Sequence, residues 1–156
     1  MEVFRITHKK WSSKLTASGL AARWNSTGIY IIYTAGSRAL ACLENVVHRA
    51  SSGLKAPFIT MVISIPDDII IKELLLEDLP KDWSKSGEIA YSKCRPFGDN
   101  WIISLETAVL KVPSAIVPED SNYLLNPSHP DFSKISILAE DSFTFDERIK
   151  KNKYNR

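Results

Sequence analysis

In residues 29–50 the pattern of apolar residues changes from one typical of a strand to one typical of a helix. This change constrains the fold more than any other feature of the sequence. Residues 29–35, IYIIYTA, are mostly β-branched or aromatic, which is typical of a buried strand. Ser37 then suits a helix N-cap, and apolar residues follow it at helical spacing, namely Leu40, Leu43, Val46 and Val47. The sequence therefore predicts a central strand followed at once by a helix of about three and a half turns that ends near 51–53.

Other short runs predict further strands around this unit. Apolar or β-branched runs bounded by proline or polar turns occupy residues 2–7, 57–66, 69–76, 108–113, 122–127 and 142–149, of which 69–76 also suits a helix. Two short helices are predicted at 87–93 and 98–105, because Pro96 and Gly98 interrupt the pattern between them. Since strands follow one another late in the chain, the order of elements predicts an α+β fold with a mixed sheet.

The length of 156 residues suits one domain, because domains most often contain about 100 to 150 residues. Hydrophobic residues make up 44% and charged residues 24%, so we expect residues 1–156 to form a single compact domain. The longest apolar runs fall well short of the roughly 20 residues that span a bilayer, and the N-terminus lacks the apolar core of a signal peptide. We therefore expect a cytoplasmic protein with no membrane partner.

The net charge of +2 conceals a basic C-terminal tail, residues 148–156. This tail contains five basic residues and no acid, so residues 1–147 carry 15 positive and 18 negative charges, a net −3. A basic tail can contact nucleic acid or an acidic partner, but it is more often a solvated end. Because the body is slightly acidic, we expect no direct nucleic-acid binding.

The cysteines and histidines form no pattern of disulfides or metal ligands. Cys42 and Cys94 have no CxxC partner, and His8, His48 and His129 stand in no ligand spacing. The sequence also lacks a phosphate-binding glycine loop, a GxSxG elbow, an HExxH pair and an EF-hand loop. We expect no disulfide and no metal, and the sequence disfavours a kinase, a GTPase, a GxSxG hydrolase and a metalloprotease.

Two polar residues flank or interrupt the predicted central strand. Arg23 lies in the loop before it, where a guanidinium can bind a phosphate through two parallel hydrogen bonds or can simply be exposed. Tyr33 shares a face of the strand with Ile31, opposite Tyr30 and Ile32. Its ring can belong to the core or can stack on a planar ligand, so the residue patterns leave both interpretations open.

Glu44 lies beside the apolar stripe of the predicted helix, with His48 four residues further on. A carboxylate at the edge of a buried stripe must be paired or have a raised pKa, and both conditions are common at active sites. The alternative is an exposed Glu44 that pairs with His48 or Arg49.

Residues 112–132 contain four prolines, with Ser114, Asn122, Asn126 and His129 between them. Proline restricts the backbone, so this segment can hold Ser114 and Asn126 rigidly at a strand end. Ordinary turns use the same residue types, so this interpretation also stays open.

Several motifs, taken together and in this order, resemble the RES domain family of bacterial toxin–antitoxin toxins. They are VFRIT, ARWNSTG with Arg23, IYTAGSRALACLENVVH with Tyr33 and Glu44, GDNWI, LKVPSAIVPEDSNYLLNPSHPDF with Ser114, and FDERI. They extend over nearly the whole chain, although residues 67–95 contribute little. The resemblance implies a fold similar to ADP-ribosyltransferase toxins and an enzyme that destroys NAD by cleaving the nicotinamide–ribose bond.

The resemblance also implies which residues form the NAD site. Arg23 is expected to hold the pyrophosphate, Tyr33 to border the nicotinamide ribose, and Glu44 to stabilise the positive charge that develops on that ribose. Ser114 is expected to bind the nicotinamide end or to fix Glu44. Further NAD-binding candidates are Trp24, Asn25 and Asn126. Asn126 and His129 are expected to shape the rim of the NAD site.

The implied partner is a cognate helix-turn-helix antitoxin that covers the site, and NAD is a substrate, so no cofactor is expected. Two alternatives stay open. The chain can transfer ADP-ribose to a protein or metabolite acceptor, or it can be a non-catalytic module that binds the antitoxin. The sequence does not distinguish water from phosphate as the acceptor in NAD cleavage.

Overall fold

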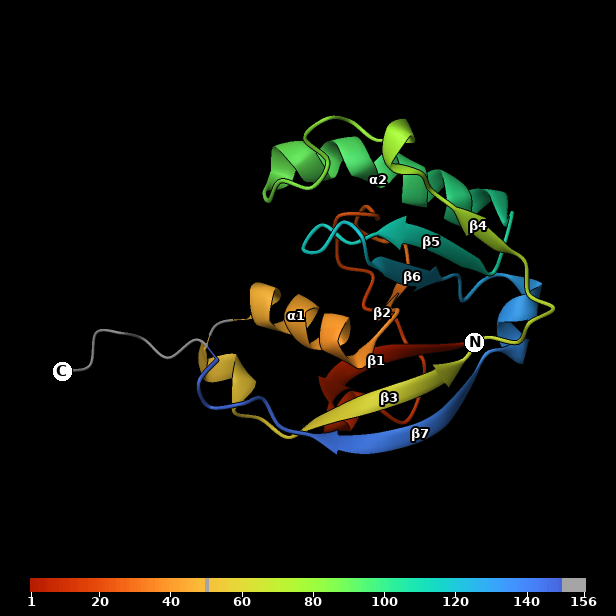
Figure 1. Ribbon diagram of the computed structural model, residues 1–156. Helices are drawn as coiled ribbons and strands as arrows, with labels where there is room; N and C mark the ends of the chain where they lie inside the picture. The colour runs from red at the N-terminus through yellow and green to blue at the C-terminus, as the bar shows by residue number, and fades with distance from the viewer. Residues whose placement is uncertain (50, 150–156) are drawn as a thin grey trace.

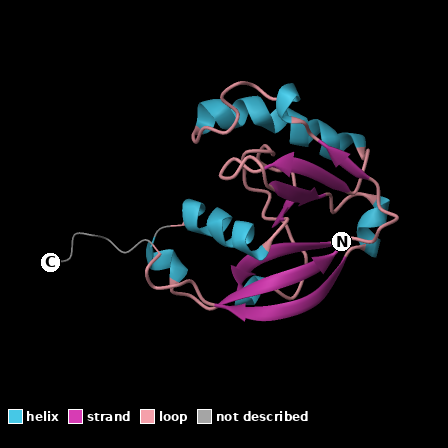
Figure 2. Cartoon of the chain, in the orientation of Figure 1, coloured by secondary structure: helices cyan, strands magenta, loops and turns pink. Residues whose placement is uncertain are grey.

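The computed structural model describes residues 1–49 and 51–149, which form a mixed sheet of seven strands with two α-helices packed on it (Figure 1, Figure 2). The strands are β1 (Glu2–His8), β2 (Ile32–Ala35), β3 (Phe58–Ser64), β4 (Ile71–Glu73), β5 (Val109–Pro113), β6 (Ser121–Leu125) and β7 (Ser136–Phe143). The helices are α1 (Arg38–His48) and α2 (Glu88–Ser104). The predicted α+β class is confirmed, whereas residues 150–156 of the predicted basic tail lie outside the described residues.

The sheet is nearly divided in two. Its strand order is β4-β5-β6-β2-β1-β3-β7, and every neighbouring pair is antiparallel except β4 and β5. β1 pairs with β3 from Glu2 to His8, but its register with β2 contains only Phe4 and Ala35. The halves β4-β5-β6-β2 and β1-β3-β7 therefore join at one narrow point and diverge beyond it, and Figure 1 shows α2 over the first half and α1 over the second.

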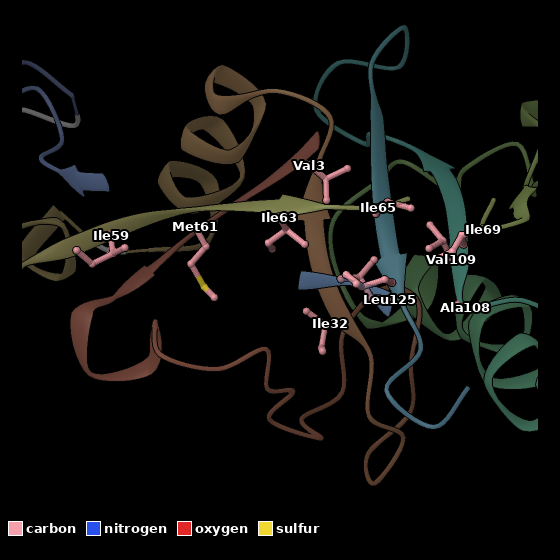
Figure 3. Close-up of a cluster of buried hydrophobic side chains, with 11 residues drawn as sticks. Val3, Ile32, Ile59, Met61, Ile63, Ile65, Ile69, Ala108, Val109 and Leu125 are labelled. Carbon is pink, nitrogen blue, oxygen red and sulfur yellow. The ribbon is translucent and has the colours of Figure 1, made fainter. Parts of the chain in front are cut away.

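The apolar side chains form three clusters on the two faces of the sheet. One face carries the cluster of Figure 3, which includes Val3, Ile32, Met61 and Val109. Because side chains alternate along a strand, neighbouring positions point to the other face, which carries two separate clusters. Residues of α1 pack there with Ile6, Ala35 and Phe58, and residues of α2 pack with Leu110, Val112 and Leu124. Both helices thus cover the same face, each over its own half of the sheet.

The predicted strand and helix of residues 29–50 are present as β2 and α1. The Ser37 hydroxyl oxygen accepts the backbone N–H of Leu40 at 3.1 Å, which confirms the N-cap. The predicted buried stripe is wrong in part, because Leu43 is 41% and Val47 55% exposed, while the buried residues of α1 are Leu40 and Ala41. Since α1 covers only one half of the divided sheet, a narrower side of the helix is buried. The helix also ends at His48 rather than near 51–53.

The two helices predicted at 87–93 and 98–105 are one continuous helix, α2, that contains Pro96. A proline removes one backbone hydrogen bond, but residues on both sides of it, Cys94, Trp101 and Ile102, are buried in the same cluster. This shared burial stabilises an uninterrupted helix. Gly98 does not interrupt the helix but allows close packing, because a Cβ atom built on it would lie 1.8 Å from the carbonyl oxygen of Trp24.

Two predicted strands are also corrected. β7 occupies residues 136–143, where it pairs with β3, rather than 142–149. Of residues 69–76, only Ile71–Glu73 form a strand, and a 3₁₀ helix begins at Leu76. Among the residues that the structure describes, no helix is both long enough and apolar enough to cross a bilayer.

Candidate functional site

A cleft of about 590 Å³ lies where the two halves of the sheet diverge. It is lined by α1, by β1 and β2, and by two loops that contain Arg23 and Ser84. Its polar lining residues include the basic or titratable side chains Arg5, Arg23, His48 and Arg49. Among the described lining residues, Glu44 is the one carboxylate. The cleft therefore combines several positive groups with one negative group, which suits an anionic ligand that gains positive charge at one atom.

Glu44 is held by contacts from three parts of the chain. The side-chain amide of Asn122 donates to its Oε1 at 2.6 Å, and the Ser114 hydroxyl donates to the same oxygen at 3.3 Å. Nε2 of His48 lies 3.6 Å from Oε2. Burial raises the pKa of Glu44, but His48, Asn122 and Ser114 together outweigh burial, so this pKa lies below its ordinary value. Glu44 is thus an ionised, oriented carboxylate, and its side chain is 25% exposed.

Ser114 is fully buried at the end of β5. Its oxygen accepts the backbone N–H groups of Ile116 and Val117 at 3.1 and 3.2 Å. With the oxygen lone pairs engaged by these donors, the hydroxyl hydrogen is directed to Glu44. The structure therefore places Ser114 against Glu44, which is the second of the two contacts that the resemblance implied for it.

Tyr33 lines the cleft with its ring and is anchored through its hydroxyl. The hydroxyl donates to Oδ1 of Asn25 at 2.7 Å and accepts the backbone N–H of Trp24 at 3.2 Å. Burial raises the pKa of Tyr33, so the hydroxyl is neutral. Asn25 is itself buried, and its amide donates to the carbonyl groups of Leu20, Ser26 and Ile29. Asn25 therefore shapes the loop behind Tyr33 and does not line the cleft.

Arg23 lines the cleft, but its guanidinium already binds the loop opposite. It donates to the backbone carbonyls of Trp83, of Lys85 at 3.1 Å and of Ser84 at 3.4 Å. It also lies 4.5 Å from the ring centroid of Tyr91. These contacts hold residues 83–85 as one wall of the cleft. Trp24 beside it also lines the cleft; it is 3% exposed and packs on Trp83 with ring centroids 6.1 Å apart, so it supports this wall.

Helix α2 anchors the loop that carries Arg23. Nε of Arg95 donates to the carbonyl of Ala22 at 2.9 Å, and Asp99 accepts both the N–H and the hydroxyl of Ser26 at 2.9 and 2.5 Å. Gly98 contacts the backbone of Trp24 between these two points. The position of Arg23 therefore depends on close packing against α2.

Asn126 and His129 lie away from the cleft. Asn126 is fully buried, and its side chain bonds the carbonyl of Ile102 and the N–H of Ser128. It follows Asn122 by four residues of an extended chain, which corresponds to roughly 13 Å. His129 accepts the N–H of Asp131 and caps a 3₁₀ helix. The structure thus does not bring Asn126 or His129 to the predicted NAD site.

Two cleft residues were not singled out from the sequence. Asn122 appeared there only as one polar residue of a proline-rich segment. Arg5 lies on β1, where its Nη1 donates to the carbonyl of Thr16 at 2.7 Å. Burial lowers the pKa of Arg5, and no carboxylate among the described residues forms an ion pair with it. A half-buried guanidinium without a carboxylate partner favours an anionic ligand. An arginine inside an apolar strand is the sequence signal that indicates it.

The chain is similar to known proteins in both sequence and fold. The sequence model of the RES domain matches residues 2–146. The chain is 40% identical over 131 residues to the Prs ADP-ribosylating toxin of Sphingobium sp., covering 81% of this chain and 79% of that protein. It is 35% identical over 155 residues to Toxin Res of Yersinia enterocolitica, covering 96% of this chain and all of that protein. The fold is similar to a chain of the Mycobacterium tuberculosis MbcT–MbcA toxin–antitoxin complex, with a TM-score of 0.71, 17% identity, and coverage of 92% of this chain and 84% of that chain.

Proposed function

This chain belongs to the RES domain family, and we propose that it is a toxin that depletes cellular NAD by cleaving the bond between nicotinamide and ribose. The observation that carries this proposal is the ionised Glu44, held by Asn122 and Ser114 in a cleft otherwise lined by positive and neutral groups. NAD has a matching charge distribution, since its diphosphate is anionic and its nicotinamide ribose becomes cationic during cleavage.

In the proposed reaction, the bond between ribose C1′ and the nicotinamide nitrogen breaks, and its electron pair leaves with nicotinamide. The ring leaves as a neutral molecule, and the ribose becomes oxocarbenium-like. An oxygen of water or of phosphate then forms a bond to C1′, and the acceptor releases its proton to solvent. Glu44 stabilises the positive charge at C1′ and orients the acceptor through Oε2, the oxygen that faces His48 and that neither Asn122 nor Ser114 contacts.

We assign the diphosphate of NAD to Arg5 and a supporting role to Arg23. The guanidinium of Arg23 is engaged by the carbonyls of residues 83–85, whereas within the described part of the chain Arg5 has one hydrogen bond, to Thr16. Arg5 thus retains N–H donors for two phosphate oxygens. The ring of Tyr33, fixed through Asn25, borders the nicotinamide ribose.

Transfer of ADP-ribose to a macromolecular acceptor is the second candidate. The observation that favours it is the 40% identity to a protein named as a Prs ADP-ribosylating toxin. The cleft chemistry at Glu44 is the same in both cases, and the acceptor alone differs.

We also propose that a cognate antitoxin binds this chain and closes the cleft. The fold is shared with a toxin from a toxin–antitoxin complex, and relatives are named as toxins. A complex with the partner is expected to consume NAD far more slowly than the free chain, and a tight complex with undiminished turnover would show that the partner does not cover the cleft.

The testing experiment is incubation of the purified chain with NAD, with and without phosphate, followed by mass spectrometry of the products. Free nicotinamide with ADP-ribose indicates hydrolysis, and a phosphorylated ADP-ribose indicates phosphorolysis. A covalent adduct on an added protein acceptor supports the second candidate. No release of nicotinamide from the folded chain would contradict both and leave a non-catalytic binding module.

A further inference from the structure

The side chain of Asn122 makes the shortest of the contacts to Glu44, yet only half of its amide is hydrogen-bonded. Its nitrogen donates to Oε1 of Glu44 at 2.6 Å. Its oxygen, Oδ1, is shielded from solvent and has no hydrogen-bond partner among the described residues. A buried polar atom without a partner destabilises a folded protein, and native structures contain few of them.

The surroundings of Asn122 explain why its oxygen is left without a partner. Asn122 lies on β6 between two neighbouring strands, opposite Ala35 of β2 and Val112 of β5. Paired residues on adjacent strands place their side chains on the same face, and neither of these neighbours has a polar side chain. Turning the amide over would place its oxygen against the carboxylate of Glu44, which accepts hydrogen bonds but cannot donate them when ionised. The orientation of this amide is therefore set by Glu44.

We infer that Asn122 is a positioning residue for the proposed reaction, which fixes Glu44 in its ionised form with one oxygen directed to C1′ of the ribose. This inference rests on the proposed function of Glu44. Ser114 approaches the same oxygen from the end of β5, at the longer distance of 3.3 Å, and His48 approaches the other oxygen from α1 at 3.6 Å. Asn122 lies on β6, which is paired on both sides, and makes the shortest of the three contacts.

Two substitutions separate this role from a merely structural one. Asn122→Leu keeps the size of the side chain and removes both the donor and the unpartnered oxygen, so the protein is expected to remain folded. Asn122→Asp keeps the shape and replaces the donor by a second carboxylate beside Glu44. Both changes remove a hydrogen bond to the ionised form, and the aspartate adds a like charge, so the pKa of Glu44 is expected to rise in both and further in the aspartate variant. Asn100→Asp, an exposed position on α2, is the control for an added negative charge.

The first readout is the pH dependence of kcat/KM for NAD. In both Asn122 variants the acidic limb is expected to move to higher pH, and kcat at neutral pH is expected to fall by about 10- to 100-fold with a smaller change in KM. The Asn100→Asp control is expected to have the same acidic limb in its pH profile, and the same kcat, as the unmodified chain. Folded Asn122 variants that retain the original limb and kcat would overturn the inference.

The second readout does not depend on activity. The titration of Glu44 is followed by NMR of protein labelled with ¹³C at the glutamate carboxyl groups, and the resonance is identified by its absence in Glu44→Gln. A higher pKa of Glu44 in the Asn122 variants supports the inference, and an unchanged pKa contradicts it. If Glu44→Gln itself cleaves NAD at the original rate, the proposed function fails. If Glu44→Gln is inactive but Asn122→Leu has the original activity and Glu44 titration, only the role of Asn122 fails.

Discussion

Replacing Gly98 by alanine tests whether the cleft depends on close contact between α2 and the loop that carries Arg23. A Cβ atom at this position would lie 1.8 Å from the carbonyl oxygen of Trp24 and 3.2 Å from its Cβ. Because Cβ atoms essentially never come closer than 3.0 Å to a backbone atom, the two backbones must separate by about 1.2 Å. This displacement affects the segment 22–26, which anchors the hydroxyl of Tyr33 through Trp24 and Asn25.

The magnitude follows from two opposing effects. On an open helix surface, glycine to alanine stabilises by about 1 kcal/mol. Inserting an atom into a well-packed contact costs about 1 to 3 kcal/mol, and the contact with a backbone carbonyl places Gly98 at the upper end of this range. We therefore expect a net loss of about 2 kcal/mol, which lowers Tm by about 4 to 8 °C for a domain of this size.

The assay combines thermal unfolding with NAD turnover of Gly98→Ala, and Gly53→Ala is the control. A Cβ atom on Gly53 would come no closer than 3.8 Å to another side chain, so little change is expected there. Gly98→Ala is expected to lower both Tm and kcat/KM. A Tm at or above that of the unmodified chain would show that α2 and the Trp24 segment are not held together as tightly as the structure indicates.

Three further predictions concern the cleft and the cell. Arg5→Lys keeps the charge but loses the planar pair of N–H donors. Steady-state kinetics are expected to show that KM for NAD rises by about tenfold or more, with a smaller change in kcat. An unchanged KM would remove Arg5 from the diphosphate site. Arg23→Lys replaces the planar guanidinium, whose two terminal nitrogens bind the carbonyls of residues 83–85, by one ammonium nitrogen that does not reproduce this geometry. Hydrogen exchange in residues 83–86 is therefore expected to become faster, and unchanged exchange would contradict the role of Arg23 in holding this wall. Production of the chain alone in bacteria is expected to lower NAD and stop growth, and normal NAD levels with abundant folded protein would oppose the enzyme assignment.

The sequence predicted the parts of the fold that are determined by local pattern. The strand and the helix on either side of Ser37 follow from apolar spacing and one N-cap, and both are present. The sequence did not predict that α2 runs through Pro96, because the local effect of proline is outweighed by burial of Cys94 and Trp101 against strands far away in the chain. The exposure of Leu43 and Val47 likewise depends on the division of the sheet, which no local pattern reveals.

The candidate site was only partly indicated by the local pattern. The positions of Glu44, Tyr33 and Arg23 left both a site role and an ordinary role open, the resemblance to the RES family assigned them to one site, and all three line the cleft. Asn122 and Asn126 occupy similar positions in the sequence, but the register of β6 brings only the first of them to Glu44, 78 residues away along the chain. Arg5 depends on the opening between β1 and β2 for its place at the cleft.

The most direct test of the central claim is the turnover of NAD by Glu44→Gln compared with the unmodified chain. The substitution keeps the size of the side chain and removes the negative charge that we assign beside ribose C1′. We expect kcat to fall by about 100- to 1,000-fold, which corresponds to about 2.7 to 4 kcal/mol of transition-state stabilisation. NAD affinity is expected to change much less, because little positive charge develops at C1′ before the bond breaks, and thermal unfolding is expected to show a folded protein. A folded Glu44→Gln protein that cleaves NAD at the original rate would contradict the account.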